Sequence, residues 1–236
     1  MTKYLRTALF IGTFAILVSC AYSQGPVTEV LKRMDAYNKS LTSFTADVTM
    51  VKTDSALGAS DTQTGSTSYI PKTAKIANGK NYARIDWKAR NGRAFDESMS
   101  VIGDNYELYS PGQNIVYQGT VGKAGNGKDK GVGTALAFMT MSRGQLTANY
   151  SVAYIADEQI KDGTMCFHVQ LTPKTAGSYK LADLWVDKNG APRQAKIVEN
   201  NNDTTTILLE KLNSNATLNA SIFKLSYPNN TTKKKV

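Results

Sequence analysis

The sequence predicts a mainly β protein of the α+β type, with an antiparallel sheet covered by helix. Apolar side chains alternate with other residues from Met165 to Thr172, and such a period of two places one row of side chains on each face of a strand. The same alternation returns in three later runs, at 181–186, 195–198 and 204–209. Polar turns separate the runs, with Lys188-Asn189-Gly190 suited to a hairpin. A meander with one apolar face needs a cover.

The segment ahead of these strands predicts one amphipathic helix over about residues 27–42. Its apolar residues recur at spacings of three and four, which gathers them on one side of a helix. They are Val27, Val30, Leu31, Met34, Tyr37, Leu41 and Phe44. A single helix of this kind can cover the apolar face of the sheet.

Six strands are expected between that helix and the middle of the chain. They lie at 44–50, 66–70, 81–89, 99–101, 106–109 and 115–118, and the small polar residues 54–65 are expected to form a loop. In the third strand, Ile85 and Trp87 point one way while Arg84 and Asp86 point the other. A later strand begins at Tyr150.

Residues 119–142 interrupt the strands. From Gly122 to Lys128 they reproduce the spacing of a phosphate-binding loop, but Asp129 stands where Ser or Thr would bind magnesium, so a plain loop is expected. Residues 134–142 are apolar and predict a short helix. That helix either packs in the core or forms a lid over a lipid-binding concavity, with Met139 and Met141 as adaptable contacts.

The first 23 residues have the pattern of an export signal. Lys3 and Arg6 precede a short apolar run, and a small-x-small cleavage site ends at Ser23. The sequence Leu17-Val18-Ser19-Cys20 also fits a lipobox, in which Cys20 would be lipidated. Both routes take the chain out of the cytoplasm. One domain is then expected over 24–228, followed by a solvated basic tail at 229–236.

Composition and residue inventory favour a folded binding protein over an enzyme. Hydrophobic content of 41% with 20% charged residues argues against disorder. The formal charge of +9 suits anionic surfaces, but no aromatic-interleaved basic cluster indicates nucleic acid. His168, the only histidine, occupies an alternating strand position, and Cys166 is expected to be a buried thiol. No metal or other cofactor is expected, because no His/Cys cluster has metal-ligand spacing.

The order of these segments resembles the outer-membrane lipoprotein carrier family, LolA. The motifs that carry the resemblance are Leu171–Lys174, Leu184–Pro192, Thr204–Ile207 and Ala220–Pro228, with looser matches at Gly65–Trp87 and Val101–Pro111. The resemblance implies an unclosed antiparallel β-barrel of about eleven strands, with helices over an apolar cavity for lipoprotein acyl chains. It also implies a periplasmic carrier between an inner-membrane lipoprotein-releasing transporter and an outer-membrane receptor. We expect a monomer.

The cavity is expected to be lined by inward-facing apolar residues. They are Val48, Met50, Ile85, Trp87, Met99, Val101, Leu136, Phe138, Met139, Phe167 and Val169. In the family an Arg-Pro pair before an aromatic-x-Trp pattern holds the lid closed. Here Pro71-Lys72 has the reverse order, so Lys72 and Arg84 are the lid-control candidates, each with a plain surface cation as the alternative.

Two rival functions remain open from sequence. A membrane-tethered receptor or envelope sensor on the same fold is favoured if Cys20 is lipidated. A secreted hydrolase would need scattered acids such as Asp183, Asp187 and Glu199 to act together.

Overall fold

The computed structural model describes residues 24–120 and 141–235 of the 236-residue chain. Several predicted features lie outside these residues: the export signal with Cys20, the loop from Gly122 to Lys128, and Leu136, Phe138 and Met139 of the apolar run. Within the described residues, no helix combines the length and the apolar character needed to cross a membrane.

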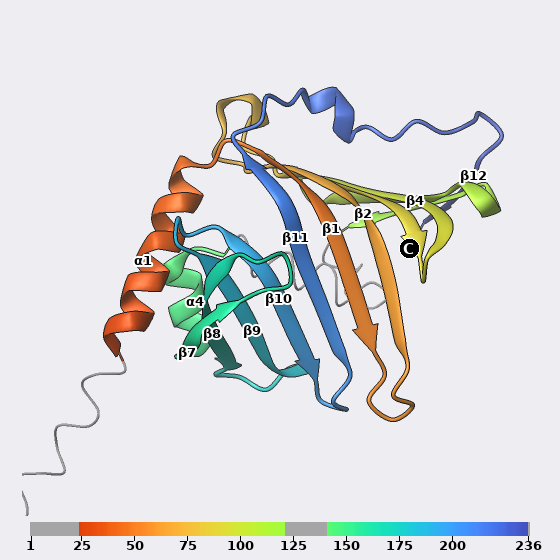
Figure 1. Cartoon of the computed structure of the whole chain (residues 1–236). Coiled ribbons are helices and arrows are strands. Elements are labelled where there is room, and N and C mark those ends of the chain that lie inside the picture. Colours follow the sequence, from red (N-terminus) through yellow and green to blue (C-terminus); the bar gives the residue numbers. More distant parts are fainter. Residues whose placement is uncertain (1–23, 121–140, 236) are drawn as a thin grey trace, which may run out of the picture.

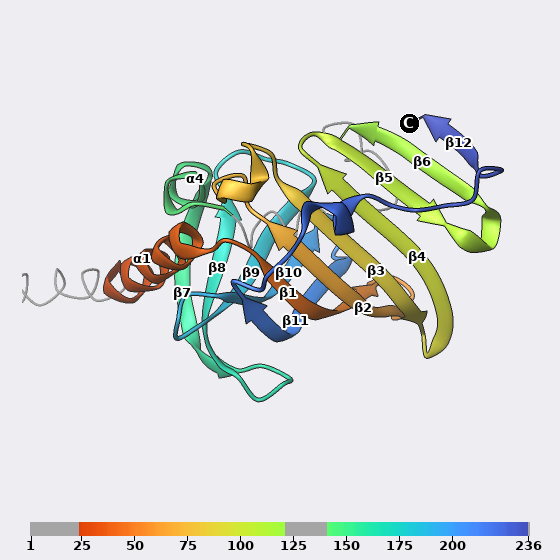
Figure 2. The ribbon, with the colours of Figure 1, turned by 90° about the horizontal axis from the view of Figure 1, so that it is seen from above.

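In the described parts of the chain, twelve strands form one open, curved sheet (Figures 1 and 2). The first six are β1 (Phe44–Thr53), β2 (Ser60–Ile70), β3 (Tyr82–Arg90), β4 (Arg93–Ile102), β5 (Asn105–Ser110) and β6 (Ile115–Thr120). The others are β7 (Tyr150–Gln159), β8 (Met165–Pro173), β9 (Tyr179–Asp187), β10 (Pro192–Glu199), β11 (Thr204–Ser214) and β12 (Thr232–Lys235). Their spatial order is β12-β6-β5-β4-β3-β2-β1-β11-β10-β9-β8-β7, so the mainly β, unclosed antiparallel sheet is confirmed.

The strand at the C-terminal end corrects one expectation. Residues 229–236 were expected to be a solvated tail, yet Thr232–Lys235 pairs in parallel with Ile115–Gln118 of β6. The side chains of β12 are exposed, as a basic tail would be, but its main chain extends the sheet. It raises the strand number from about eleven to twelve.

The second strand also begins earlier than expected. Residues 60–65 are small and polar, which predicted a loop, but they pair with β1 from Thr53↔Ser60 to Val48↔Gly65. β3 pairs with them on the other side. Threonine, which recurs here, is favoured in strands, and two flanking partners satisfy its main chain.

The N-terminal helix forms as predicted, as α1 (Gln24–Ser40). It buries Val30, Leu31 and Met34 and lies beside β7 and β8 in both views (Figures 1 and 2). Another helix among the described residues, α4 (Arg143–Asn149), was not predicted. A capping box between Ser142 and Gln145 begins it, and its Leu146 is fully buried.

The turn between β9 and β10 fixes the position of α1. Gly190 has a φ of +88° and touches the helix main chain so closely that an added Cβ would lie 2.3 Å from the Arg33 carbonyl oxygen. Arg33 also donates to the Lys188 carbonyl oxygen over 2.9 Å. A residue with a side chain at 190 would therefore push the helix away.

The segment between β11 and β12 packs on the face of the sheet that carries Arg84 and Ser100, which donate to the carbonyl oxygens of Ile222 and Phe223. The neighbouring pair Ile85 and Met99 projects to the other face, toward the core that includes α1. The segment contains a short 3-10 helix, η3 (Ala220–Phe223), whose Phe223 is fully buried against Ile70, Ala74 and Ala77. We call the side of the sheet that packs against α1 and α4 the inner face, and the side that carries this segment the outer face.

Candidate functional site

Strand register places the described cavity candidates on one face of the sheet. Val48 pairs with Gly65, which pairs with Trp87, and Ile85 pairs with Met99. Met50 connects through Ile207, Ala195 and Leu184 to Val169 on the other half of the sheet. Directly paired residues project to the same side. Val48, Met50, Ile85, Trp87, Met99, Val101, Phe167 and Val169 therefore share the inner face.

Most of these residues are packed as core. Val48, Met50, Ile85, Trp87 and Val169 are each at most 4% exposed and belong to one cluster with Val30, Leu31 and Met34 of α1. Met99 and Phe167 pack against that cluster and remain partly exposed. The buried members hold the helix and sheet together, so ligand contact would fall first to the partly exposed positions.

The partly exposed part of the inner face continues across β4, β5 and β6. Met99 pairs with Leu108, and Val101 pairs with Tyr106. Leu108 in turn pairs with Tyr117. All five are half-buried. Tyr106, Leu108 and Tyr117 were not among the predicted site residues, although the alternation of β5 and β6 could have identified them once β4 was placed.

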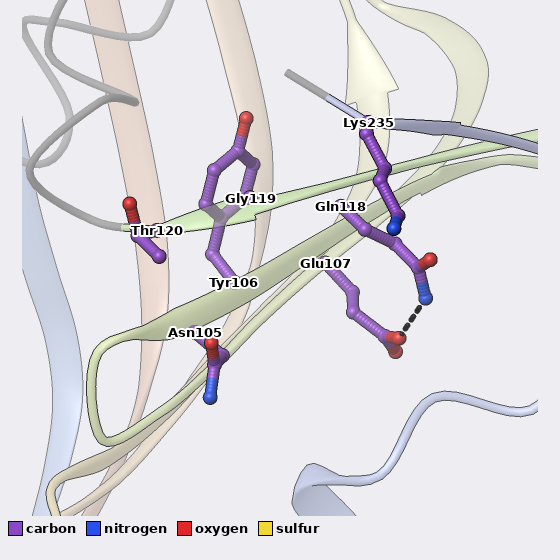
Figure 3. Close-up of a pocket in the computed structure, with 7 residues that line it drawn as sticks. All are labelled: Asn105, Tyr106, Glu107, Gln118, Gly119, Thr120 and Lys235. Carbon is purple, nitrogen blue, oxygen red and sulfur yellow. Dashed lines mark hydrogen bonds between the residues drawn. The ribbon is translucent and has the colours of Figure 1, made fainter.

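An open pocket of about 400 Å³ lies at the end of this region (Figure 3). It is lined by Asn105, Tyr106, Glu107, Gln118, Gly119, Thr120 and Lys235. Gln118 donates to Glu107 over 2.6 Å, and Tyr106 points away from that pair (Figure 3). Tyr106 therefore joins a polar rim to the apolar inner face.

Arg84 projects from the side of the sheet opposite to α1. It belongs to the outer face, where its guanidinium binds both carboxylate oxygens of Asp86 over 2.8 and 2.9 Å and donates to the Ile222 carbonyl oxygen. Arg84 thus holds the segment between β11 and β12. This placement does not support the expected lid-control role, and it agrees with the strand phase that set Arg84 opposite Ile85.

Lys72 is exposed in the turn between β2 and β3. Its main-chain nitrogen donates to Asn81 Oδ1 over 3.0 Å, and its ammonium makes no hydrogen bond or ion pair with another described residue. These surroundings fit a plain surface cation better than a lid-control residue.

His168 is held on the outer face by groups that occupy both ring nitrogens. Nδ1 lies 3.0 Å from Glu158 Oε1, Nε2 lies 3.1 Å from Asp183 Oδ1, and the ring stacks on Trp185 with centroids 4.3 Å apart. Hydrogen bonds from Trp185 and His168 lower the pKa of Glu158. With both nitrogens engaged, His168 connects β7, β8 and β9 and has no free nitrogen to serve as a base.

Cys166 is buried on the same side, packed with Ile160, Trp185 and Leu208, as predicted. Burial raises the pKa of its thiol to about 12, which keeps it protonated. Among the described residues, no group of three or more His, Cys, Asp or Glu side chains could hold a metal ion.

The sequence model of the family "Outer membrane lipoprotein carrier protein LolA" matches residues 124–226. Among curated proteins, no relative matches.

Several solved structures share the fold. An uncharacterized conserved protein from Thermus thermophilus is 9% identical with a TM-score of 0.56, and the match covers 89% of this chain and 99% of that one. MucB, solved alone, is 13% identical with a TM-score of 0.52, covering 84% of this chain and 62% of MucB. A chain of the MucA/MucB complex of Pseudomonas aeruginosa is 11% identical with a TM-score of 0.50, and the match covers 84% of this chain and 60% of that one.

Proposed function

Since this chain is LolA-like, in the family match over residues 124–226 and in its unclosed antiparallel sheet, we propose that it binds lipid acyl chains on its inner face. Its role would be that of an exported periplasmic carrier, which shields the acyl chains of a lipoprotein or related lipid on the way to the outer membrane. Such transport needs a shield, because each CH₂ group exposed to water costs about 0.8 kcal/mol.

One observation supports this proposal most directly: an apolar, partly exposed surface runs across β4–β6 on the same face as the core. Met99, Val101, Tyr106, Leu108 and Tyr117 form this surface, and register continues it into the packed cluster under α1. A sheet face of this kind offers apolar contacts at an edge of the core, where an acyl chain can bind without disrupting buried packing.

A matched pair of substitutions tests the proposal. Val101→Glu places a carboxylate on the inner face, and Val51→Glu places the same group on the outer face, beside Thr62 and Thr206. Both valines are half-buried strand residues. Burial of a charge against an acyl chain is unfavourable, so only Val101→Glu should weaken lipid binding.

The measurement is native mass spectrometry of protein purified without detergent, with extraction of co-purified lipid and titration with a fluorescent acyl probe. We expect lipid on the wild type and on Val51→Glu, and its loss from Val101→Glu. A wild type that carries no lipid and takes up no probe would refute acyl binding. Equal loss in both variants would refute the assignment to the inner face.

The tethered alternative depends on Leu17-Val18-Ser19-Cys20. A receptor or sensor held at a membrane would begin at a lipidated Cys20, whereas a shuttle between membranes would begin after Ser23. Intact mass of the processed protein separates the two, because lipidation adds a diacylglycerol-sized increment. In the carrier proposal, an inner-membrane transporter supplies the cargo and an outer-membrane receptor accepts it.

A further inference from the structure

We propose that the turn between β2 and β3, together with η3 and Lys224, forms a docking surface for an anionic lipid bilayer. We call this surface the lysine turn and define it by residues 71–81 and 215–224. The inference goes beyond acyl-chain binding, because a protein could hold lipid on its inner face without docking on a membrane here.

The first support for this inference is the positive charge of the lysine turn. The two segments contain four lysines, Lys72, Lys75, Lys80 and Lys224, and no acidic residue. All four lysines are exposed, and none makes an ion pair with another described residue. Asp104, which follows Gly103 beside the Lys80 side chain, is the neighbouring acid. The lysine turn therefore has a net positive charge that is open to an anionic partner.

The lysine turn is also pre-organised. Ala74 donates to the Pro71 carbonyl oxygen, Ala77 to that of Ala74, and Lys80 to that of Ala77, each over 2.9 Å. Ala74 and Ala77 are buried with Phe223 of η3, which joins the two segments through one small core. Lys75 lies between the two buried alanines and is exposed, so little ordering of the main chain is needed when a partner binds.

An exposed apolar side chain distinguishes a bilayer from a purely acidic protein. Ile76 follows Lys75 directly and is 50% exposed, although the residues on either side of this pair, Ala74 and Ala77, are buried. A cationic turn with one apolar tip matches the bilayer interface, where lysines meet anionic headgroups and an aliphatic group enters the acyl boundary. This combination favours an anionic membrane surface over an acidic polypeptide.

The test is co-sedimentation of the full-length exported protein with phosphatidylcholine vesicles that contain or lack phosphatidylglycerol. The docking variant is Lys72→Gln/Lys75→Gln/Lys80→Gln. Its matched control is Lys32→Gln/Lys161→Gln/Lys188→Gln, which removes the same charge from exposed lysines elsewhere on the molecule. A third variant, Ile76→Ser, removes only the apolar tip.

We expect binding to the anionic vesicles alone, weakened by added salt. Loss of each lysine should weaken it about 5-fold, so the docking variant should bind about 100-fold more weakly while the control variant stays near wild type. Ile76→Ser should weaken it about 10-fold. Equal loss in both triple variants would show a general charge effect and overturn the proposal. Binding of polyglutamate without binding of anionic vesicles would overturn it in favour of an acidic protein.

Discussion

Replacement of Gly190 by alanine tests whether the β9–β10 turn sets the position of α1. Two penalties are expected. A φ of +88° is unfavourable for alanine by about 1–2 kcal/mol. The new Cβ would also lie 2.3 Å from the Arg33 carbonyl oxygen and 2.9 Å from the Met34 nitrogen. Relief of that overlap requires α1 to move, at a further cost of about 1–3 kcal/mol.

Gly92→Ala is the matched control for the backbone penalty. Gly92 has a φ of +75°, and an added Cβ there would meet nothing within 4 Å. We expect Gly92→Ala to lower the free energy of unfolding by about 1–2 kcal/mol and Gly190→Ala by about 2–5 kcal/mol. Equilibrium urea unfolding followed by far-UV circular dichroism measures both values. Equal losses in the two variants would refute the contact between α1 and the turn.

Two further predictions concern Cys166 and Arg84. Because burial raises the pKa of the Cys166 thiol to about 12, the folded protein should react slowly with a thiol reagent at pH 8, and urea should make the reaction fast. In the unfolded chain the thiol ionises near pH 9, so between about pH 9 and 12 ionisation favours the unfolded state and the free energy of unfolding should fall. A free energy of unfolding that rises over that interval would contradict the raised pKa of Cys166. Arg84→Met should release the segment held at Ile222, seen as faster limited proteolysis within 215–231, without changing acyl-probe affinity. A changed affinity with unchanged proteolysis would restore Arg84 as a lid-control residue.

Side-chain alternation predicted the sheet and its two faces well. Each apolar residue in β1, β3 and β8 that alternation assigned to the cavity face lies on the inner face, because a strand buried on one side has little freedom to change phase. The same alternation set Arg84 opposite Ile85. The motif comparison that made Arg84 a lid candidate ignored strand phase, and the structure follows the phase.

Features that depend on distant partners were not predictable in this way. Residues 60–65 form a strand because β1 and β3 flank them, and their polar composition alone suggests a loop. Thr232–Lys235 has no alternation, and its strand exists because β6 offers an unpaired edge. Whether an apolar residue lines a cavity or fills the core depends on how α1 packs. Val48 is buried in the cluster that includes α1, whereas Met99 packs against that cluster and stays partly exposed.

The lysine turn and the inner face are connected through the same strands, which links docking to transfer of cargo. β2 and β3 extend from residues 71–81 into the sheet, and β3 carries Ile85 and Trp87 on its inner face. Docking at this turn would bring one end of the inner face toward the bilayer, so that an acyl chain could pass into lipid with less exposure to water. Lys72→Gln/Lys75→Gln/Lys80→Gln should therefore slow transfer of a fluorescent acyl probe to phosphatidylglycerol vesicles while its affinity for the probe in solution stays unchanged. A variant that no longer sediments with these vesicles but still transfers the probe at the wild-type rate would show that release does not depend on docking at the lysine turn, and that the acyl chain leaves at another edge of the sheet.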